Sequence, residues 1–288
     1  MAARSPRLRQ AAAPYALLLP SALFLLALLG WPVISAIGQA FTGAHGGTEN
    51  WRQMVAEPQF WTSVRNTSLL VVVLIPLQFS LAVAMALLLR ERLRARGFYF
   101  YVWTVPLAVS DLAAGLVWLS IFTGNGYLNS ALGWFGVHPV DWLSYQNTST
   151  MFLAVLVAEL WRATSLVMII LVAGMQMIPR DYDEAAQVFG ASFWQRLRHV
   201  TLPLMRPSIQ VALILRTILA FQAFAAAQAL TGTQFPLLIG QTYLWFVGLN
   251  DPHVASAVAL VVLGVSMVTA IGYLFMLRQP RGAGGGAR

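Results

Sequence analysis

Long apolar stretches alternate with short polar segments along almost the whole chain. A helix that crosses a membrane needs about 20 mostly apolar residues, because the hydrocarbon core is about 30 Å thick and each residue advances the helix by about 1.5 Å. Six stretches meet this requirement, at about 14–38, 67–89, 98–122, 151–178, 207–230 and 253–277. The pattern therefore predicts an all-α polytopic membrane protein with six transmembrane helices.

The first apolar stretch has a second interpretation, a secretory signal peptide, since Arg4, Arg7 and Arg9 precede it. The chain carries no charged residue from Gln10 to Thr48, which is far longer than the 7–15 apolar residues typical of a signal peptide. We therefore expect a retained span.

The arginines indicate how the spans are oriented. Three lie before the first span, four in 90–97, four in 179–206 and three in the C-terminal tail, against two, Arg52 and Arg65, in the alternate segments. Basic residues near membrane ends accumulate on the cytoplasmic side. Both termini are therefore predicted to be cytoplasmic, and the aromatic residues between 98 and 103 are expected to mark the inner interface of the third span.

The segments between the spans are too short for a folded soluble domain. We expect a cytoplasmic N-terminal tail at 1–10, a transmembrane domain at 11–278, and a flexible, glycine-rich cytoplasmic tail at 279–288. The cytoplasmic segment 179–206 lies within the transmembrane domain.

The composition removes several classes of function. Only 10% of the residues are charged and 58% are hydrophobic, and the net charge of +8 is explained by the orientation signal rather than by nucleic-acid binding. The chain has no lysine and no cysteine, so it has no phosphate-binding P-loop lysine, no Schiff base and no thiolate site. The four histidines show no metal-binding spacing. We expect no catalytic residue, no metal and no cofactor on this chain, which is therefore predicted not to be an enzyme.

The 179–206 segment has the signals of two short helices. Asp181 is expected to cap the first, with Glu184 completing a capping box. Ala185, Ala186 and Phe189 then form a small apolar face at helical spacing.

A turn and a second helix are expected to follow. Gly190 permits a tight turn, Ser192 and Gln195 form a second capping box, and Pro203 is expected to end that helix. One interpretation is an amphipathic connector lying on the inner leaflet. The small apolar face favours the other, insertion into a groove of a partner protein.

Three pieces of this segment, Glu184-Ala185-Ala186, Gly190-Ala191 and Leu202-Pro203, resemble the EAA loop of ABC-importer permease subunits. In that family the loop is a coupling helix that docks into a cleft of the cytoplasmic ATPase. Leu197 departs from the phenylalanine that the family often has. The resemblance implies that the ATPase-coupling residues are Asp183, Glu184, Ala185, Ala186, Phe189, Gly190, Ala191, Leu197, Leu202 and Pro203.

The resemblance extends to the carbohydrate-uptake branch of the family. It is carried by Leu19-Pro20, Trp31-Pro32, Pro106, Trp118, Gly126–Asn129, Glu159–Trp161, Phe221, Phe224 and Leu230–Gly232. It implies a type I, maltose-permease-like fold in a bacterial cytoplasmic membrane. It also implies an extracytoplasmic solute-binding protein, a second permease subunit that is a paralogue, and two cytoplasmic ATPase subunits that hold ATP and Mg.

Four charged residues fall within the predicted spans: Asp111, Glu159, Arg162 and Arg216. Each costs about 2.5–3.5 kcal/mol or more at the bilayer centre, so they should face the bundle or a wet cavity. We expect Glu159 to pair with Arg162 on one helix face, and Asp111 to pair with Arg216 across the bundle. These four, with Gln222, are candidates for the substrate pathway, and a purely structural clamp is an equal alternative. Gln78 and Gln228 are further candidates.

Two classes of function compete. The first is the permease subunit of an ATP-driven importer that translocates a carbohydrate or related polar solute, with ATP hydrolysis coupled through 181–199. The second is a secondary transporter or channel that uses the intramembrane charges, but it leaves the EAA-like segment without a purpose.

Overall fold

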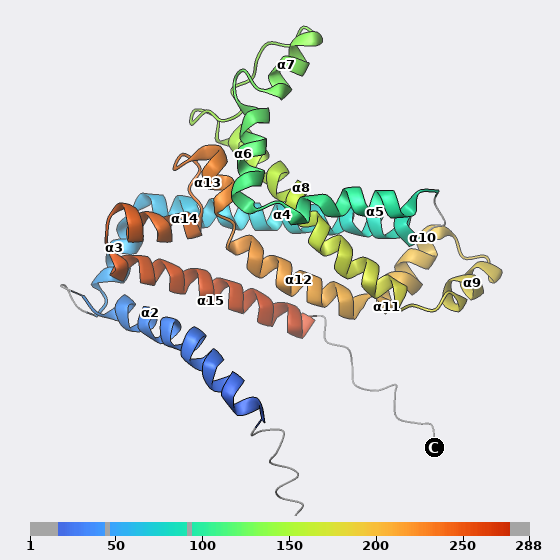
Figure 1. Ribbon diagram of the computed structural model, residues 1–288, viewed down its shortest axis with the longest axis horizontal. Coiled ribbons are helices and arrows are strands. Elements are labelled where there is room, and N and C mark those ends of the chain that lie inside the picture. Colours follow the sequence, from blue (N-terminus) through green and yellow to red (C-terminus); the bar gives the residue numbers. More distant parts are fainter. Residues whose placement is uncertain (1–16, 44–46, 91–93, 277–288) are drawn as a thin grey trace, which may run out of the picture. The chain divides into compact units, whose positions relative to one another are not determined.

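The computed structural model describes residues 17–43, 47–90 and 94–276, and within these ranges the chain is helical with no strand (Figure 1). It divides into two compact units, Met1–Glu57 with Thr242–Val261, and Pro58–Gln241 with Val262–Arg288. The tails expected at 1–10 and 279–288 lie outside the described residues.

Unit 1 contains the first expected span as one apolar helix, Leu17–Phe41, whose second part is η1 (Leu26–Gly30) and α2 (Trp31–Phe41). The side chain of Asn50, in α3 (Glu49–Ala56), donates to the carbonyl oxygens of Ala40 at 3.1 Å and Thr42 at 2.8 Å. These bonds fasten α3 to the end of α2, where backbone carbonyls have no partner within the helix.

The rest of unit 1 comes from the C-terminal part of the chain. It includes η4 (Leu244–Gly248) and the first turns of α15 (Pro252–Met276). His253 Nδ1 lies 3.0 Å from the carbonyl oxygen of Gln39, and Ser256 Oγ donates to Gln39 Oε1 at 3.2 Å. Gln39 therefore joins α2 to α15.

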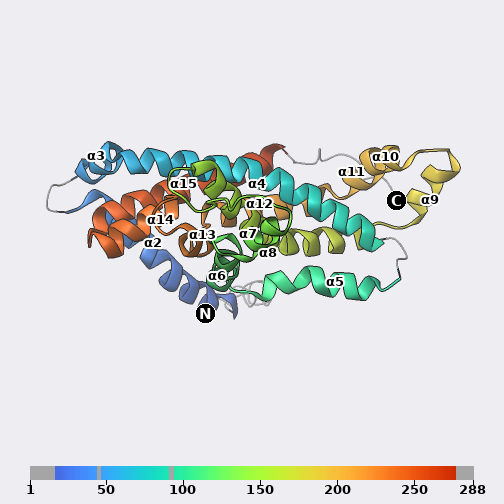
Figure 2. The ribbon, with the colours of Figure 1, turned by 90° about the horizontal axis from the view of Figure 1, so that it is seen from above.

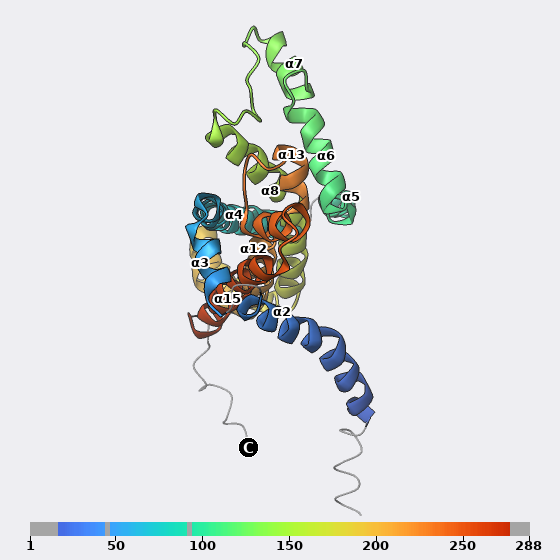
Figure 3. The same cartoon turned by 90° about the vertical axis from the view of Figure 1, so that its left-hand side faces the viewer.

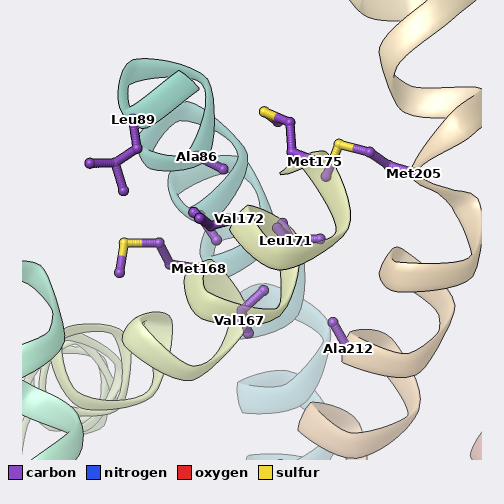
Figure 4. Packing of buried hydrophobic residues seen from close by; sticks show 10 residues of the cluster. Ala86, Leu89, Val167, Met168, Leu171, Val172, Met175, Met205 and Ala212 are labelled. Carbon is purple, nitrogen blue, oxygen red and sulfur yellow. The ribbon is translucent and has the colours of Figure 1, made fainter. Parts of the chain in front are cut away.

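Two long helices, α4 (Pro58–Arg90) and α8 (Thr148–Gln176), pack along each other in unit 2, and α12 (Arg206–Phe221) packs against both (Figure 2). Their shared core contains Leu89 from α4, Leu171 and Met175 from α8, and Ala212 from α12 (Figure 4). Small residues allow the helices to approach closely. A Cβ at Gly174 would lie 2.1 Å from Ser208 Oγ.

The third expected span, 98–122, is broken into separate helices. It consists of α5 (Arg96–Thr104), η2 (Val105–Ala108) and α6 (Asp111–Phe122), with a bend of 102° (Figure 3). Two residues cause the break. Pro106 lies in the 3-10 turn, and Ser110 Oγ accepts from the Ala113 N–H at 3.2 Å, which caps a new helix.

The fifth expected span, 207–230, is also two helices, because α12 ends at Phe221 and α13 (Ala225–Thr231) follows a short break. A short helix, α7 (Tyr127–Trp134), extends the chain beyond α6. In unit 2, α13 packs against α6, and a Cβ at Gly115 would lie 2.7 Å from the Cβ of Ala229. This close approach explains the small residues around Gly115.

Beyond α13, the chain returns to α4 through buried polar contacts. Asn66 Nδ2 donates to the Pro236 carbonyl oxygen at 3.1 Å, and the N–H of Leu238, the first residue of α14 (Leu238–Tyr243), donates to Thr67 Oγ1 at 2.9 Å. Leu237, which lies between these two contacts in the sequence, is buried.

In the described residues, four helices are long and apolar enough to cross a membrane, and there are six such elements if each of two bent pairs is one span. One pair contains the break between α5 and α6, and the other bends by 71° before α12. The all-α polytopic fold expected from the sequence is confirmed.

Candidate functional site

The interior of unit 2 holds a group of polar side chains that we name the charge cluster: Gln78, Asp111, Glu159, Arg162 and Arg216. Arg216 on α12 lies at its centre, with 1% of its side chain exposed. Its Nη2 donates to Glu159 Oε2 on α8 at 3.0 Å, and its Nε donates to Gln78 Oε1 on α4 at 2.7 Å. Gln78 Nε2 in turn donates to the Glu159 carbonyl oxygen at 3.3 Å. Three helices are thus joined through one guanidinium.

The outer part of the charge cluster is a second ion pair. Arg162 Nη1 lies 2.7 Å from Asp111 Oδ1, and Arg162 Nη2 lies 3.7 Å from Glu159 Oε2. The expected pair of Glu159 with Arg162 is therefore confirmed. The Asp111 side chain is 45% exposed, so the cluster extends from a buried end to an accessible one.

The expected pairing of Asp111 with Arg216 is wrong. The bend before α6 makes Asp111 the first residue of a helix, where the helix dipole favours a carboxylate, and there it meets Arg162. Glu159 and Gln78 accept from Nη2 and Nε of Arg216. The actual pairs are Asp111 with Arg162 and Glu159 with Arg216.

The charge cluster is electrically balanced, since two arginines face two carboxylates. Burying ions this deeply is costly, and only good geometry with further hydrogen bonds offsets the cost. Gln78 supplies such bonds, although Arg162 Nε is buried and has no hydrogen-bond partner in the described part of the chain.

The glutamine candidates have different surroundings. Gln78 is fully buried and belongs to the charge cluster, whereas Gln222 is an exposed residue just beyond the end of α12, outside the cluster. Gln228 lies half-buried on α13. The sequence signal for Gln78 is a polar amide side chain within an uncharged, otherwise apolar stretch.

Aromatic rings continue from the accessible end of the charge cluster along α6 and α8. Trp161, next to Arg162, is 37% exposed, and its ring centroid lies 6.1 Å from that of Trp118 in an edge-to-face arrangement. Trp118 stacks on Phe122 at 5.5 Å. Carboxylate, guanidinium and indole groups are therefore grouped along one part of unit 2.

The 179–206 segment contains α9 (Asp181–Val188), α10 (Phe193–Arg196), η3 (Leu197–Thr201) and α11 (Leu202–Leu204). The expected cap by Asp181 is wrong, because Arg180 occupies the N-cap position and no side chain caps α9. Asp181 lies instead in the first turn with Asp183 and Glu184, where three carboxylates interact favourably with the helix dipole.

The turn at Gly190 is confirmed. Gly190 has a φ of +77°, a left-handed conformation that favours glycine. Its N–H donates to the Gln187 carbonyl oxygen at 2.9 Å, and the Ala191 N–H donates to that of Ala186 at 3.0 Å. This pair of bonds is a Schellman motif, which satisfies carbonyls at the end of α9.

The second capping box is also confirmed. The Ser192 N–H donates to Gln195 Oε1 at 2.7 Å, and the Gln195 N–H donates to Ser192 Oγ at 3.4 Å. Pro203 lies one residue before the end of the continuous helical run Phe193–Leu204, which is followed by a bend of 71° before α12. The expected end of this helix is therefore confirmed to within one residue.

One contact in this segment had no sequence signal that we recognised. Arg196 Nη1 lies 3.6 Å from Asp183 Oδ2, and Gln187 Nε2 donates to the same oxygen at 3.1 Å. The ion pair joins α9 to α10 across the Gly190 turn, and so contributes to the angle between the two helices.

The outer surface of the 179–206 segment is apolar. Val188, Phe189 and Trp194 are 85%, 90% and 74% exposed. Ala185 is exposed and Ala186 half-buried, whereas Leu197 is buried and Leu202 is half-buried. The structure therefore divides the expected coupling residues into an outer group centred on Phe189 and an inner group that holds the segment in place.

An all-helical, multi-pass chain with a buried neutral charge cluster and an exposed helical segment between two spans is the architecture of a transport subunit. Residues 78–279 match the family described as the inner membrane component of binding-protein-dependent transport systems. The chain belongs to this family, which confirms the family resemblance and the permease class predicted above.

Two relatives are similar over most of the chain. The sulfoquinovosyl glycerol transport system permease protein of Agrobacterium fabrum is 31% identical over 279 residues, which cover 91% of this chain and 89% of that protein. The trehalose/maltose transport system permease protein of Thermococcus litoralis is 31% identical over 236 residues, which cover 79% and 78%.

A solved structure shares the fold. One chain of the crystal structure of a bacterial ABC transporter that imports the acidic polysaccharide alginate superposes with a TM-score of 0.81 at 22% identity, over 96% of this chain and 100% of that one. The ABC-importer permease fold expected from the sequence is thus confirmed.

Proposed function

We propose that this chain is the permease subunit of an ATP-driven importer, and that it translocates a carbohydrate or a related polar solute. The observation that carries the proposal is the 179–206 segment, in which two locally capped helices present Phe189 and Trp194 to the outside. A compact apolar surface of this kind suits insertion into a groove of a partner protein.

The energy source lies on other chains. A chain without lysine has no P-loop lysine. As the family membership implies, ATP and Mg would be bound by two cytoplasmic ATPase subunits. Their closure moves the 179–206 segment, and this motion reorients the spans. Asp183, Glu184, Ala185, Ala186, Phe189, Gly190 and Ala191 form the docking part, and Leu197, Leu202 and Pro203 anchor it.

The remaining partners follow from the same proposal. An extracytoplasmic binding protein delivers the solute, and a paralogous permease subunit completes the pathway. The names of the relatives support a carbohydrate, since they refer to sulfoquinovosyl glycerol and to trehalose and maltose. The arginine distribution supports a bacterial cytoplasmic membrane with both termini, and the 179–206 segment, inside.

The accessible end of the charge cluster is proposed to line the solute pathway. Asp111 is partly exposed, and Trp161 lies next to its partner Arg162. A carboxylate can accept hydrogen bonds from hydroxyl groups, and an indole face packs against apolar faces of a ring. Glu159 and Arg216 are buried too deeply to contact a solute, and they hold the helices together. Gln222 remains a candidate for the pathway because its side chain is exposed.

The test of the proposal is co-purification of the ATPase subunits with two variants of Gly190. A Cβ at Gly190 meets no atom within 4 Å, so only the positive φ opposes substitution. Gly190→Val is therefore expected to distort the turn and to abolish both co-purification and solute-stimulated ATP hydrolysis. Gly190→Asn is the matched control, because asparagine tolerates the left-handed conformation, and it should retain both activities.

Transport that persists without any ATPase subunit and follows an ion gradient would contradict the proposal. That outcome would favour a secondary transporter that uses the charge cluster. Equal loss in both Gly190 variants would instead show that the turn geometry is not what the partner recognises.

A further inference from the structure

A cavity of about 160 Å³ lies in unit 2 at the end where α4 finishes, α5 begins and α8 leads to α9. Three arginines line it, Arg90, Arg96 and Arg180, one from each of these regions. We name it the arginine pocket. Figures 1 and 2 both place the start of α5 and the helix α9 at the same end of unit 2.

Among the residues that the structure describes, the lining of the arginine pocket includes no acidic side chain that could neutralise its positive charge. Among the described residues, Arg52, Arg162, Arg196 and Arg216 each have a carboxylate partner. No such ion pair is found there for the three arginines of the pocket. Three like charges around one small cavity repel each other, so an anion between them is stabilised.

The local backbone adds to this preference. Arg96 is the first residue of α5, and no side chain caps that helix. The N–H groups of an uncapped first turn carry partial positive charge, and they lie at the position from which Arg96 extends.

The floor of the arginine pocket is apolar. Leu89, Val172 and Met175 line it and are buried at 1%, 7% and 3% exposure. They also belong to the core shared by α4, α8 and α12 (Figure 4). A basic rim over an apolar floor suits an amphiphile better than a small hydrophilic anion.

The surface next to the pocket is typical of a membrane interface. Directly after Arg96, α5 presents Phe98, Tyr99 and Tyr101, which are 64%, 42% and 69% exposed. Aromatic side chains concentrate at the level of the lipid headgroups. Basic pockets between transmembrane helices at this level bind anionic headgroups.

We propose that the arginine pocket binds a phosphate group, supplied by the phosphodiester headgroup of an anionic lipid. Arg90, Arg96 and Arg180 contact the phosphate oxygens, and the acyl chains lie along the apolar surface beside α5. Because Arg180 is the N-cap residue of α9, the bound lipid ties the ends of α4, α5 and α8 to the start of the 179–206 segment. The proposal rests on the proposed function in one respect, the assignment of the arginine pocket to the cytoplasmic side of the membrane.

The test uses the intact transporter complex in nanodiscs of phosphatidylcholine, with and without phosphatidylglycerol. Retained lipid is counted by native mass spectrometry after detergent release. The triple variant R90Q/R96Q/R180Q is expected to retain at least about tenfold less phosphatidylglycerol than the unmodified complex. The control R278Q/R281Q/R288Q removes three arginines from the C-terminal tail, and should retain as much as the unmodified complex.

Two single-residue variants test the proposal if the triple variant fails to assemble. Arg96→Gln is expected to lower retention about fivefold, whereas Arg94→Gln, in the same loop but not in the lining of the pocket, should leave it unchanged. Co-purification of the ATPase subunits, measured on the same samples, reports on the proposed function separately from lipid binding.

A second arm distinguishes a lipid from a soluble phosphate. In discs of phosphatidylcholine alone, inorganic phosphate is added and its binding is followed by phosphorus NMR. Binding that requires the three arginines, without selective retention of phosphatidylglycerol, would support the phosphate site but move its source to the aqueous phase. Equal retention and equal phosphate binding in all variants would overturn the proposal, as would equal loss in the C-terminal control.

Discussion

In the charge cluster each charged group has a partner on another helix, whereas in the 179–206 segment most polar contacts join residues three or four positions apart. Arg216 bonds Glu159 and Gln78, which lie 57 and 138 positions away. Ser192 and Gln195, by contrast, lie three positions apart. The first arrangement exists only when three helices are packed. The second forms within one turn, and it leaves apolar side chains free for another protein.

This difference predicts different costs of mutation. The charge cluster is buried, so a missing partner leaves an uncompensated ion in an apolar interior. The ion pair of the 179–206 segment is partly exposed, with 19% of the Arg196 side chain and 29% of the Asp183 side chain accessible, so water screens it more than the charge cluster and it is worth less energy. Loss of the ion pair between Asp183 and Arg196 should therefore change the angle between α9 and α10 more than the stability of the protein.

The largest effect is expected from Glu159→Leu. It leaves Arg216 buried without its carboxylate, which should cost about 3–5 kcal/mol, measured as thermal unfolding of the purified complex. The double variant Glu159→Leu/Arg216→Leu removes both charges and should recover most of the loss. A double variant as unstable as the single one would show that the pair is not the source of the effect.

An intermediate effect is expected at the accessible end of the charge cluster. Asp111→Arg places two arginines together. It should lower the free energy of unfolding by about 1–3 kcal/mol, and it should also lower the rate of transport. Exchanging the charges, in Asp111→Arg/Arg162→Asp, should restore part of the loss.

The control for this exchange is Asp111→Arg/Arg216→Asp, which should give no rescue because Arg216 pairs with Glu159. Rescue by Arg216→Asp instead of Arg162→Asp would contradict the observed pairing. Transport assays on the charge-exchanged variant then test the pathway role. If Asp111 and Arg162 only hold the helices together, transport should recover along with stability, whereas a role in the pathway predicts that transport stays low.

The smallest change in stability is expected from Arg196→Gln, about 1 kcal/mol, because this ion pair is more exposed than that of Arg216 with Glu159. The angle between α9 and α10 loses one constraint, so solute-stimulated ATP hydrolysis should fall more than stability does. Asp183→Asn should have the same effect, and the double variant should be no worse than either single one. Additive losses would show that the two side chains act independently.

The predictable features of this protein are the local ones. The Schellman turn needs only Gly190, and the second capping box needs only Ser192 and Gln195. Apolar runs of about 20 residues are enough to locate most spans. The same local reasoning misplaced the cap of α9. Asp181 is a suitable capping residue, but α9 begins one residue earlier than expected, so that Arg180 is the N-cap and Asp181 lies in the first turn.

The features that sequence reasoning missed depend on packing. Asp111 could be assigned a partner only after the bend before α6 was known, and the sequence signals for that bend, Pro106 and Ser110, lie inside an apolar run long enough for a straight span. Asp183 and Arg196 come together because the Gly190 turn fixes the direction of α10. In both cases a change of chain direction determines which charges meet.

The electrical balance of the charge cluster has a consequence for how the spans move. Shifting one elementary charge through the membrane potential involves about 2.3 kcal/mol per 100 mV. The cluster, with Asp111 and Glu159 against Arg162 and Arg216, moves as a neutral body when its helices reorient together. The four charged side chains of the cluster would therefore contribute no net work against the membrane voltage in such a movement.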